Sequence, residues 1–331
     1  MSTAVAYDRA ALVAFAQASI ARGSKSFGAA SQLFDAQTRE RAHLLYAWCR
    51  ACDDIADGQD HGGTMNVSVN PSGMAIDDLP TDAEALERVG AIHRLTDLAY
   101  AGQPSGEPAF DCLGVLLLEC PIPRVFADAL LQGFDRDAAG WYPRSETDLF
   151  SYCWNVAGSV GCMMAIVMGV DPADEDTLDR ACDLGLAFQL SNIARDVAED
   201  AAADRCYLPE EWLVEMDIPP GAHMHPAWRH RIAIIAKWLA EFVDMYEASA
   251  CIGAARLPLR SRWAVLSAAG IYGDIARKVH AAGDRAWDHR IGTSKGEKLA
   301  HIARAAWRSV RPLPASPEAQ ARAGLWTRPR T

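Results

Sequence analysis

Two stretches decide the fold of this chain: Asp53-Asp54-Ile55-Ala56-Asp57 and Asp196-Val197-Ala198-Glu199-Asp200. Each places two aspartates four residues apart in sequence that otherwise has the apolar period of a buried helix. Like charges at this spacing share a helix face and destabilise an isolated helix by roughly 0.2–0.5 kcal/mol per pair. Apolar surroundings add a desolvation cost. The two stretches therefore predict helices that hold a cation.

Other polar residues continue each acidic pair along its helix face at steps of three or four positions. The first stripe is Tyr46, Arg50, Asp53 and Asp57, and the second is Gln189, Asn192, Asp196 and Asp200. Two polar stripes in apolar helices are expected to face each other across a shared cavity. Asp54 and Glu199 lie about 100° off these stripes and are assigned a supporting role.

Strand signals are nearly absent from the chain, and we predict an all-α bundle in a single domain, 1–331. No linker separates two halves, and the two acidic stripes need one another. Helical periodicity appears at 7–22, 36–57, 82–101, 107–119, 123–138, 146–169, 174–199, 226–252, 256–282 and 296–309.

Two segments lack any period. Residues 58–80 are rich in Gly, Asp, Asn, Ser and Pro, which predicts a long mobile loop, either a lid or a disordered segment. Residues 311–331 contain several Pro and Arg and are expected to form a frayed tail.

Composition excludes several classes of protein. A formal net charge of −11 argues against nucleic-acid binding, which requires a basic face. The nine cysteines have no framework spacing and suit reduced thiols in a cytosolic protein. Cys49 and Cys52 form a C-x-x-C without a second pair, so buried thiols are preferred to a zinc or redox site.

The chain shows no secretory signal and no run long enough to cross a bilayer, because its longest apolar run covers only residues 160–170. We expect a cytoplasmic protein whose membrane contact, on the inner membrane, would be peripheral.

Carboxylates grouped with amide oxygens, and without clustered His or Cys, suit Mg²⁺ held together with substrate phosphates. Arg50, Arg195 and Arg205 lie near the acidic stretches and could bind a diphosphate, to which Lys25 near the N-terminus could add a contact. Each arginine could instead pair with a neighbouring aspartate. No nucleotide-binding or hydrolase motif is present, so no nucleotide is expected, and His223 and His225 are expected at the surface.

Four separated segments resemble the squalene/phytoene synthase family, and in particular its bacterial phytoene-forming members. They are Ser24-Lys25-Ser26-Phe27, residues 46–57, residues 189–200, and the run from Leu257 through Ile271-Tyr272-Gly273-Asp274-Ile275 to Arg285-Ala286-Trp287-Asp288. The match spans about residues 15–300. Trp154 replaces a more usual tyrosine, and the loop after Asp57 is longer than in the family.

The resemblance implies a helical bundle of the class I isoprenoid (terpenoid) synthase type and a role for each matching residue. The Mg²⁺ ligands would be Asp53, Asp57, Asn192, Asp196 and Asp200. The diphosphates would contact Ser24, Lys25, Ser26, Tyr46, Arg50, Gln189, Asn192, Arg195 and Tyr272, joined by Arg205 from the charge pattern. Tyr207 would lie near the reacting centre, and catalysis would use the four aspartates with Tyr46, Arg50, Arg195 and Tyr207.

The resemblance also implies a prenyltransferase reaction. Two geranylgeranyl diphosphates would condense head to head through prephytoene diphosphate to phytoene, the first committed step of carotenoid biosynthesis, with release of two diphosphates. Mg²⁺ is required, Mn²⁺ remains an alternative, and no NADPH is expected. Downstream carotenoid enzymes are possible partners. Two other readings stay open: a squalene- or diapophytoene-type synthase that uses farnesyl diphosphate, and a non-catalytic relative that acts as an assembly or lipid-binding factor.

Overall fold

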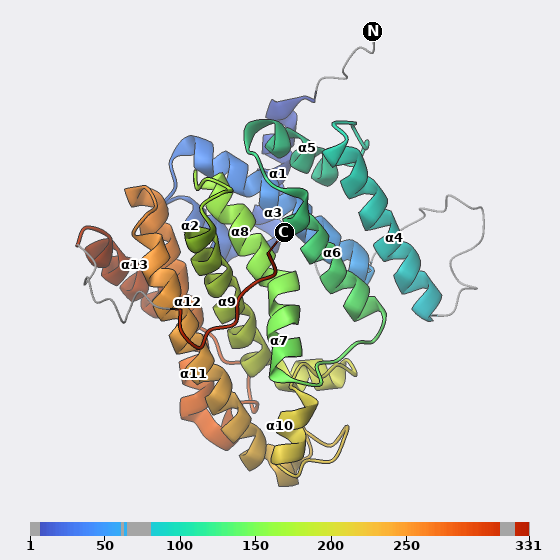
Figure 1. Cartoon of the computed structure of the whole chain (residues 1–331), viewed down its shortest axis with the longest axis vertical. Coiled ribbons are helices and arrows are strands. Elements are labelled where there is room, and N and C mark those ends of the chain that lie inside the picture. Colours follow the sequence, from blue (N-terminus) through green and yellow to red (C-terminus); the bar gives the residue numbers. More distant parts are fainter. Residues whose placement is uncertain (1–6, 61–62, 65–80, 312–321, 331) are drawn as a thin grey trace. The chain divides into compact units, whose positions relative to one another are not determined.

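Helices form nearly all the regular structure of the protein, as the sequence predicts. The computed structural model describes residues 7–60, 63–64, 81–311 and 322–330 (Figure 1). Within these residues the only strands are β1 (Gln59–Asp60) and β2 (Gly63–Thr64), which pair antiparallel. The chain divides into two compact units, Met1–Trp141 and Tyr142–Thr331, and each is described by itself. The assignment of 1–331 to one domain stays a prediction.

In the first unit, α3 is the central helix and packs against α1, α4 and α5. Its apolar side buries Leu44, Leu45 and Trp48, which lie with Leu113 and Leu116 in the core. The helices of this unit are α1 (Arg9–Gly23), α2 (Lys25–Ser31), α3 (Ala36–Asp57), α4 (Thr81–Tyr100), α5 (Pro108–Glu119) and α6 (Arg124–Ala138).

Local chemistry determines both ends of α3. The Asp35 side chain accepts a hydrogen bond from the Thr38 backbone N–H at 3.0 Å, which caps the first turn. Gly58 ends the helix in the left-handed conformation, with φ of 63°, where glycine is favoured. The helix therefore stops directly after Asp57, and the first acidic pair lies at its carboxyl end.

In the second unit, α9 is the central helix and packs against α7, α8, α11 and α12. Leu178, Leu186 and Leu190 are fully buried along it. The helices of this unit are α7 (Glu146–Cys153), the π-helix η2 (Trp154–Gly158), α8 (Ser159–Val167), α9 (Glu175–Ala202), α10 (Glu210–Glu215), the 3₁₀ helix η3 (Pro226–Trp228), α11 (Arg229–Ala254), α12 (Leu259–Ala282), the 3₁₀ helix η4 (Gly283–Arg285) and α13 (Lys295–Ser309).

Two glycines allow α8 and η2 to approach α9 closely. A Cβ atom on Gly161 would lie 2.4 Å from the backbone oxygen of Ala181, and one on Gly185 would lie 2.4 Å from that of Ala157. Any side chain at either position would push the helices apart. The small residues near Gly161 thus serve helix packing.

The continuous helical stretch Glu146–Val167 is long and apolar enough, by length and composition, to cross a membrane. Most of it is buried inside the protein, where it packs on α9. A buried central helix of a folded domain has the same composition, so we assign this stretch to the core of the second unit.

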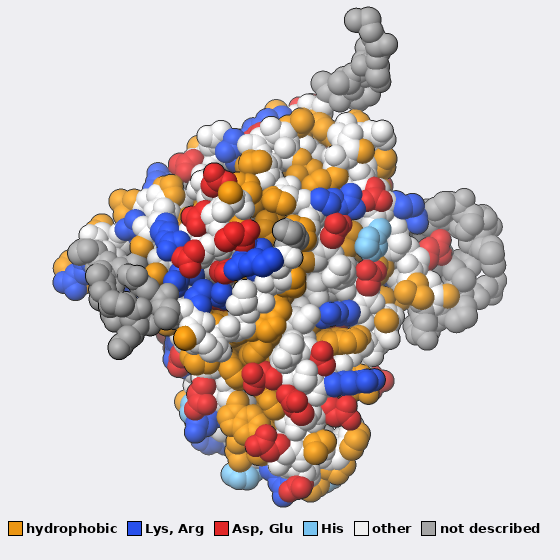
Figure 2. Space-filling model, viewed as in Figure 1, with side chains coloured by type: hydrophobic (Ala, Val, Ile, Leu, Met, Phe, Trp, Pro, Cys, Tyr) orange, Lys and Arg blue, Asp and Glu red, His pale blue; other side chains and the backbone are white. Residues whose placement is uncertain are grey.

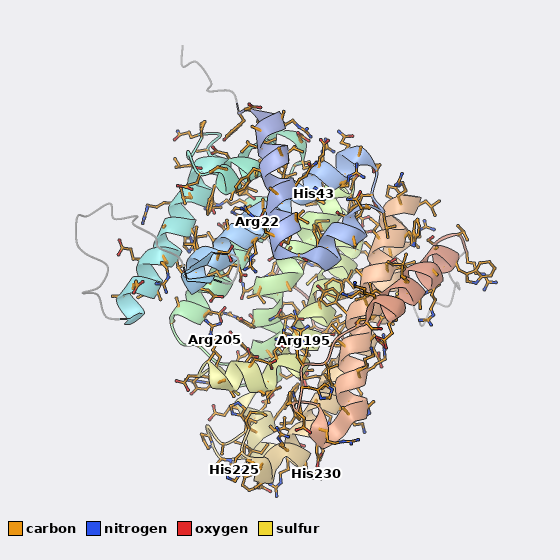
Figure 3. All side chains as sticks on the ribbon, turned by 180° about the vertical axis from the view of Figure 1, so that it is seen from behind. Arg22, His43, Arg195, Arg205, His225 and His230 are labelled. Atoms are coloured by element: carbon orange, nitrogen blue, oxygen red, sulfur yellow. The ribbon has the colours of Figure 1, made fainter. Side chains whose placement is uncertain are left out.

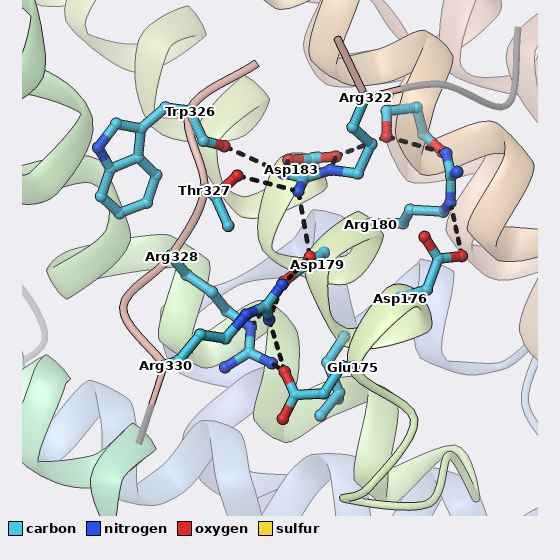
Figure 4. A network of polar contacts seen from close by, with 12 residues as sticks. Glu175, Asp176, Asp179, Arg180, Asp183, Arg322, Trp326, Thr327, Arg328 and Arg330 are labelled. Carbon is cyan, nitrogen blue, oxygen red and sulfur yellow. Dashed lines mark hydrogen bonds and ion pairs between the residues drawn. The ribbon is translucent and has the colours of Figure 1, made fainter. Parts of the chain in front are cut away.

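The predictions for the two segments without helical period, 58–80 and 311–331, compare differently with the structure. Of the predicted loop 58–80, only residues 58–60 and 63–64 are described, so the prediction of a lid or disordered segment lies outside the described residues. The expectation of a frayed tail over 311–331 differs from the structure at residues 322–330. This part of the chain lies along α9 and binds it through three arginines (Figure 4).

The arginines of the tail face acidic residues in the first half of α9. Arg322 donates to Asp183 at 2.6 and 2.8 Å, and Arg330 donates to Asp179 at 2.6 and 2.7 Å. Arg328 lies 3.0 Å from Asp179. Acidic and basic side chains adjoin where this segment, dark red in Figure 1, crosses the face shown in Figure 2. These ion pairs hold the segment in place, because the Asp183 side chain is completely buried and needs a counter-charge.

Replacement of Arg322 by Ala should destabilise the protein by about 3 kcal/mol, because the substitution leaves the buried Asp183 charge without its guanidinium. Arg330→Ala is the matched control. That side chain is 48% exposed, and its loss should cost about 1 kcal/mol or less. Chemical denaturation followed by circular dichroism measures both. Equal stability of the two variants would contradict the assigned role of the Arg322–Asp183 pair.

Candidate active site

Both acidic pairs lie at the carboxyl ends of their helices. Asp53 and Asp57 occupy the last two turns of α3, and Asp196 and Asp200 occupy the last two turns of α9. The carboxyl end of a helix carries the negative end of its dipole, where cations are favoured and anions are not. Neither helix has a basic residue in its last turn. The position of the pairs thus adds to the unfavourable free energy of ionising both carboxylates, which their spacing already raises.

Arg50 compensates part of the negative charge at the end of α3. Its guanidinium lies 3.1 Å from Asp53 and 2.6 Å from Asp54. The Asp54 side chain is nearly buried, whereas that of Asp53 is half exposed and Asp57 lies at the surface. The alternative that an arginine pairs with a neighbouring aspartate is therefore realised at Arg50, which Asp54 holds in place.

Asp53 retains an unfavourable charge despite Arg50. Although half of the Asp53 side chain is exposed, the protein atoms around its carboxylate displace enough water that desolvation, together with the like charge of Asp57, raises the pKa of Asp53 to about 6. Arg50 acts in the opposite direction and does not cancel the shift. A divalent cation between Asp53 and Asp57 would remove this cost.

The segment around residues 24–27 lies against α3, as the predicted site requires. Ser24 caps α2 by accepting a hydrogen bond from the Phe27 N–H at 3.2 Å. The Phe27 ring stacks on Tyr46, with 5.1 Å between ring centroids. The first unit thus brings Ser24 and the backbone of α2, which includes Lys25 and Ser26, beside the stripe that begins at Tyr46. The side chains of Lys25 and Ser26 lie outside the described atoms.

Two arginines surround Asp196 in the second unit. Arg195 binds it through two hydrogen bonds, one of them 2.7 Å long, and Arg290 lies 3.0 Å from it. Arg290 also lies 3.3 Å from Glu199. Arg195 was predicted as a site residue, but Arg290 was not. Arg290 lies two residues after the segment 285–288 that carries the family resemblance, but its partner Glu199 is 91 residues away in sequence, so no local pattern marks it.

The carboxylate of Asp200 has a strongly raised pKa. Burial and the like charge of Asp196 raise the pKa of Asp200 to about 7, although Arg205 opposes the shift. The neighbouring Arg195 is partly buried in the second unit, whereas the exposed His225 and His230 lie at one end of this unit (Figure 3). Burial and a like charge thus act on Asp200 as they act on Asp53, and a divalent cation would offset both.

A small cavity adjoins Asp200. It brings together two predicted residues, Arg205 and Tyr207, and one unexpected residue, His223; its full lining is Ile193, Val197, Asp200, Arg205, Cys206, Tyr207, Leu208 and His223. Tyr207 is buried and stacks on Tyr152 at 4.9 Å between ring centroids. The expected surface position of His223 is wrong, because its side chain is buried, and burial lowers its pKa. Its Pro/Gly-rich surroundings gave no signal of this.

The remaining predicted residues of the second unit lie on α9 and α12. Gln189 and Asn192 are half-buried on α9. Tyr272, on α12, stacks on Phe188 with 4.2 Å between ring centroids. Burial raises the pKa of the Tyr272 phenol, and the positive charge of Arg195 opposes this shift. Trp287 donates a hydrogen bond at 3.1 Å to the Ala194 carbonyl, next to Arg195. These contacts hold the acidic end of α9 in place.

The donor atoms fit a hard divalent cation within each unit. Across the residues that the structure describes, no three His, Cys, Asp or Glu side chains cluster to form a complete metal site. Mg²⁺ rarely needs one, because it is usually held by one or two carboxylates together with water and phosphate oxygens. Burial and a like charge raise the pKa values of Asp53 and Asp200, and a divalent cation beside either carboxylate would offset this cost. That the two stripes face one shared cavity stays a prediction.

The cysteine pair of the same helix is a poor metal site. Both Cys49 and Cys52 are free thiols, and burial raises their pKa values, that of Cys49 to about 12. Metal ligation requires the thiolate, which burial disfavours here. These observations favour the interpretation of Cys49 and Cys52 as apolar packing residues.

The raised pKa of Asp200 predicts a pH-dependent stability. The folded protein holds this proton more tightly than the unfolded chain, whose aspartates titrate near pH 4. Stability of the metal-free protein should therefore fall as the pH rises from about 4 to about 7 and remain lower above that. Asp200→Asn removes this charge, so at pH 8 the variant should be more stable than the wild type by about 1–2 kcal/mol.

The gain should shrink toward zero near pH 4, and thermal unfolding across this pH range, with a chelator present, measures it. The control is Glu215→Gln, which replaces an exposed carboxylate and should leave stability unchanged. A metal-free Asp200→Asn protein that is less stable than the wild type at pH 8 would refute the charge argument.

Comparison with known proteins identifies the family. Residues 20–324 match the family model described as squalene/phytoene synthase. The chain is 42% identical over 326 residues to a phytoene synthase of Pseudescherichia vulneris, a match that covers 96% of this chain and 98% of the relative. It is 40% identical over 314 residues to a 15-cis-phytoene synthase of Pantoea ananas, covering 94% and 96%.

Solved structures agree on the fold. A dehydrosqualene synthase superimposes with a TM-score of 0.76 at 23% identity, covering 90% of this chain and 96% of that one. A squalene synthase of Alicyclobacillus acidocaldarius gives 0.70 at 16% identity, covering 85% and 97%. Both neighbours confirm the all-α fold. A match over nearly the whole chain, with both acidic pairs inside it, shows that the chain belongs to the squalene/phytoene synthase family.

Proposed function

We propose that this protein is a prenyltransferase that condenses two molecules of geranylgeranyl diphosphate to phytoene and releases two diphosphates. One observation carries the proposal: relatives with 40–42% identity over almost the whole chain are phytoene synthases. The presence of both acidic pairs in the described structure supports catalysis over a purely structural role. The reaction would supply a hydrocarbon to downstream carotenoid enzymes and would take place in the cytoplasm.

The acidic pairs would hold Mg²⁺ against the diphosphates of the substrates. When bound, Mg²⁺ stabilises the negative charge that develops on a departing diphosphate. Asp53 and Asp57 of α3, and Asp196 and Asp200 of α9, would supply carboxylate oxygens, and Asn192 would add an amide oxygen. The raised pKa values of Asp53 and Asp200 support this assignment, because they mark sites that lack positive charge. Mn²⁺ could take the same oxygen ligands.

The arginines beside the acidic pairs would bind and orient the diphosphates. Arg50 and Arg195 each hold a carboxylate and can present their remaining N–H groups to phosphate oxygens. Arg290, bound to Asp196 and Glu199, would join them. Ser24, Lys25, Ser26, Tyr46, Gln189, Arg205 and Tyr272 remain predicted contacts.

The apolar and aromatic side chains would exclude water from the reacting carbons. Loss of the first diphosphate leaves an allylic cation, which the double bond of the second substrate attacks, with loss of a proton, to form the cyclopropyl intermediate. Loss of the second diphosphate, rearrangement and loss of another proton then give phytoene. Tyr207, buried against Tyr152 beside Asp200, would line the reaction chamber near these carbons. No reductant enters this balance, so NADPH is not required.

A second function is favoured by the structural neighbours. The structure with a TM-score of 0.76 is a dehydrosqualene synthase. A condensation of two farnesyl diphosphates would use the same acidic pairs, because only the depth of the apolar pocket distinguishes the two chain lengths. The higher sequence identity to phytoene synthases favours the longer substrate.

Incubation of the purified protein with Mg²⁺ and either geranylgeranyl or farnesyl diphosphate separates the two functions. We expect phytoene from the longer substrate and little or no hydrocarbon from the shorter one, as measured by chromatography and mass spectrometry. A protein that converts only farnesyl diphosphate would establish the second function. Absence of any hydrocarbon from either substrate would favour a non-catalytic role.

Replacement of Asp53 or Asp196 by Ala should lower turnover by at least about 100-fold, because each substitution removes a group that stabilises developing charge. The helical fold should persist, as measured by circular dichroism. Glu87→Ala in the first unit and Glu215→Ala in the second are matched controls, since both remove an exposed carboxylate. Full activity in either aspartate variant would exclude the metal assignment.

The metal assignment also predicts a binding effect that needs no turnover. Mg²⁺ and inorganic diphosphate together should raise the unfolding temperature of the wild type, because a ligand that binds only the folded state stabilises it. Diphosphate without Mg²⁺ should do so much less, and the Asp200→Asn variant should lose most of the shift. An equal shift in wild type and variant would mean that diphosphate binds independently of this carboxylate.

A further inference from the structure

Helix α13 presents a row of apolar side chains to solvent. Leu299, Trp307 and Val310 are 67%, 60% and 66% exposed, and the exposed Ala303 lies between them. Positions 299, 303, 307 and 310 are separated by four, four and three residues, which places them on one face of the helix. We call these four residues the outer stripe. Large side chains aligned in this way are unlike the scattered exposed apolar residues of an ordinary surface.

Contacts on the opposite face fix the orientation of α13. Ala305 is buried against Cys251, Ala254 and Leu266 of α11 and α12. Trp263 of α12 donates a hydrogen bond to the Ile302 carbonyl at 2.8 Å. The helix therefore cannot rotate to bury the outer stripe without losing these contacts.

Basic side chains follow one edge of the outer stripe. Arg304 and Arg308 are exposed and lie within about one residue step of it around the helix, and the exposed Arg311 follows the helix end at Ser309. The Arg311 guanidinium lies 4.3 Å from the centroid of the Trp307 ring. Their contacts among the described residues are with neutral groups: Arg304 lies 3.5 Å from a ring nitrogen of His301, Arg308 hydrogen-bonds the Cys251 side chain, and none of the three forms an ion pair with a described carboxylate. Most arginines of this acidic chain do find such a partner, as Arg322 and Arg330 show.

We propose that the outer stripe and its arginine edge form a docking surface for an anionic lipid bilayer. Leucine, valine and tryptophan would enter the boundary between headgroups and acyl chains, where the tryptophan ring is favoured. The arginines would remain at the level of the lipid phosphates, with their stems along the apolar surface. A helix that lies in the interface with an apolar face and a basic edge has this chemistry.

The positive charge of the arginine edge favours an anionic bilayer over a second copy of this chain as the binding partner. The protein carries a net charge of −11, so long-range repulsion from an anionic surface is expected. Exposed charges act only within about 8–10 Å at physiological salt, and the arginine edge would dominate at that range. The same arginine edge on a second copy would meet like charge across a symmetric contact. This inference concerns the surface of α13 alone and does not depend on the substrate.

Sedimentation with vesicles tests the docking surface on the full chain. The wild type should bind vesicles of phosphatidylcholine with phosphatidylglycerol, and should bind phosphatidylcholine alone much more weakly. High salt should reduce the binding. Arg304→Gln/Arg308→Gln/Arg311→Gln should lower the partition coefficient by roughly 100-fold, at about fivefold for each cation near the surface.

Leu299→Ser/Trp307→Ser should lower binding by about tenfold or more, because the variant loses the apolar surface that enters the bilayer. Leu118→Ser is the matched control: this leucine of α5 is 76% exposed, and the neighbouring Arg9 and Arg41 are already paired with Glu119. All variants should keep wild-type turnover on detergent-dispersed substrate, so loss of vesicle binding is distinguishable from failure of the proposed reaction.

Three outcomes would overturn the proposal. Failure of the wild type to sediment with anionic vesicles would exclude a bilayer as the binding partner. Variants that bind the vesicles as tightly as the wild type would exclude α13 as the membrane-binding surface. A dimer in light scattering that Leu299→Ser/Trp307→Ser converts to monomer, without vesicle binding by the wild type, would assign the outer stripe to a protein interface instead.

Discussion

Uncompensated carboxylate charge at the ends of two helices is the constraint on which the rest of the site depends. Both pairs combine like charges on one helix face with the negative end of the helix dipole, and at Asp53 and Asp200 burial adds to these effects and raises the pKa. The protein offsets only part of this cost, since Arg50 binds Asp53 and Asp54, and Arg195 binds Asp196. The remaining charge gives each unit an affinity for a cation and lowers the stability of the metal-free fold.

This partial compensation also explains why the arginines suit a diphosphate site. A guanidinium that is held by one carboxylate has a fixed direction, and its other N–H groups remain available to phosphate oxygens. Arg50 is fixed by the nearly buried Asp54, and Arg290 by Asp196 and Glu199. The residues judged to be supporting from the sequence, Asp54 and Glu199, are thus the ones that fix arginines beside the proposed metal ligands.

Capping residues at both ends made the limits of α3 predictable from the sequence. Ion pairs between residues far apart in the chain could not be predicted in this way. The helix at 36–57 is bounded by an Asp cap and by Gly58, so its predicted limits match the structure. The short helices α2 and α10 were missed, because seven and six residues give too few turns for a period to appear. Arg290 and the tail arginines were missed for another reason: their partners, such as Asp196 and Asp183, lie about 90 to 140 residues away.

Arginines have different surroundings on α9 and on α13 of the second unit. On α9, cations meet acidic residues at both ends, with Arg322 and Arg330 at its beginning and Arg195 and Arg290 near its end. The tail therefore secures the first half of the helix whose last turns carry the acidic pair, and α9 need not depend on packing alone for its position. On α13, by contrast, arginines border exposed apolar side chains and lack such partners among the described residues. The exposed guanidinium groups beside Trp307 are therefore the charges on which the proposed docking to an anionic bilayer depends.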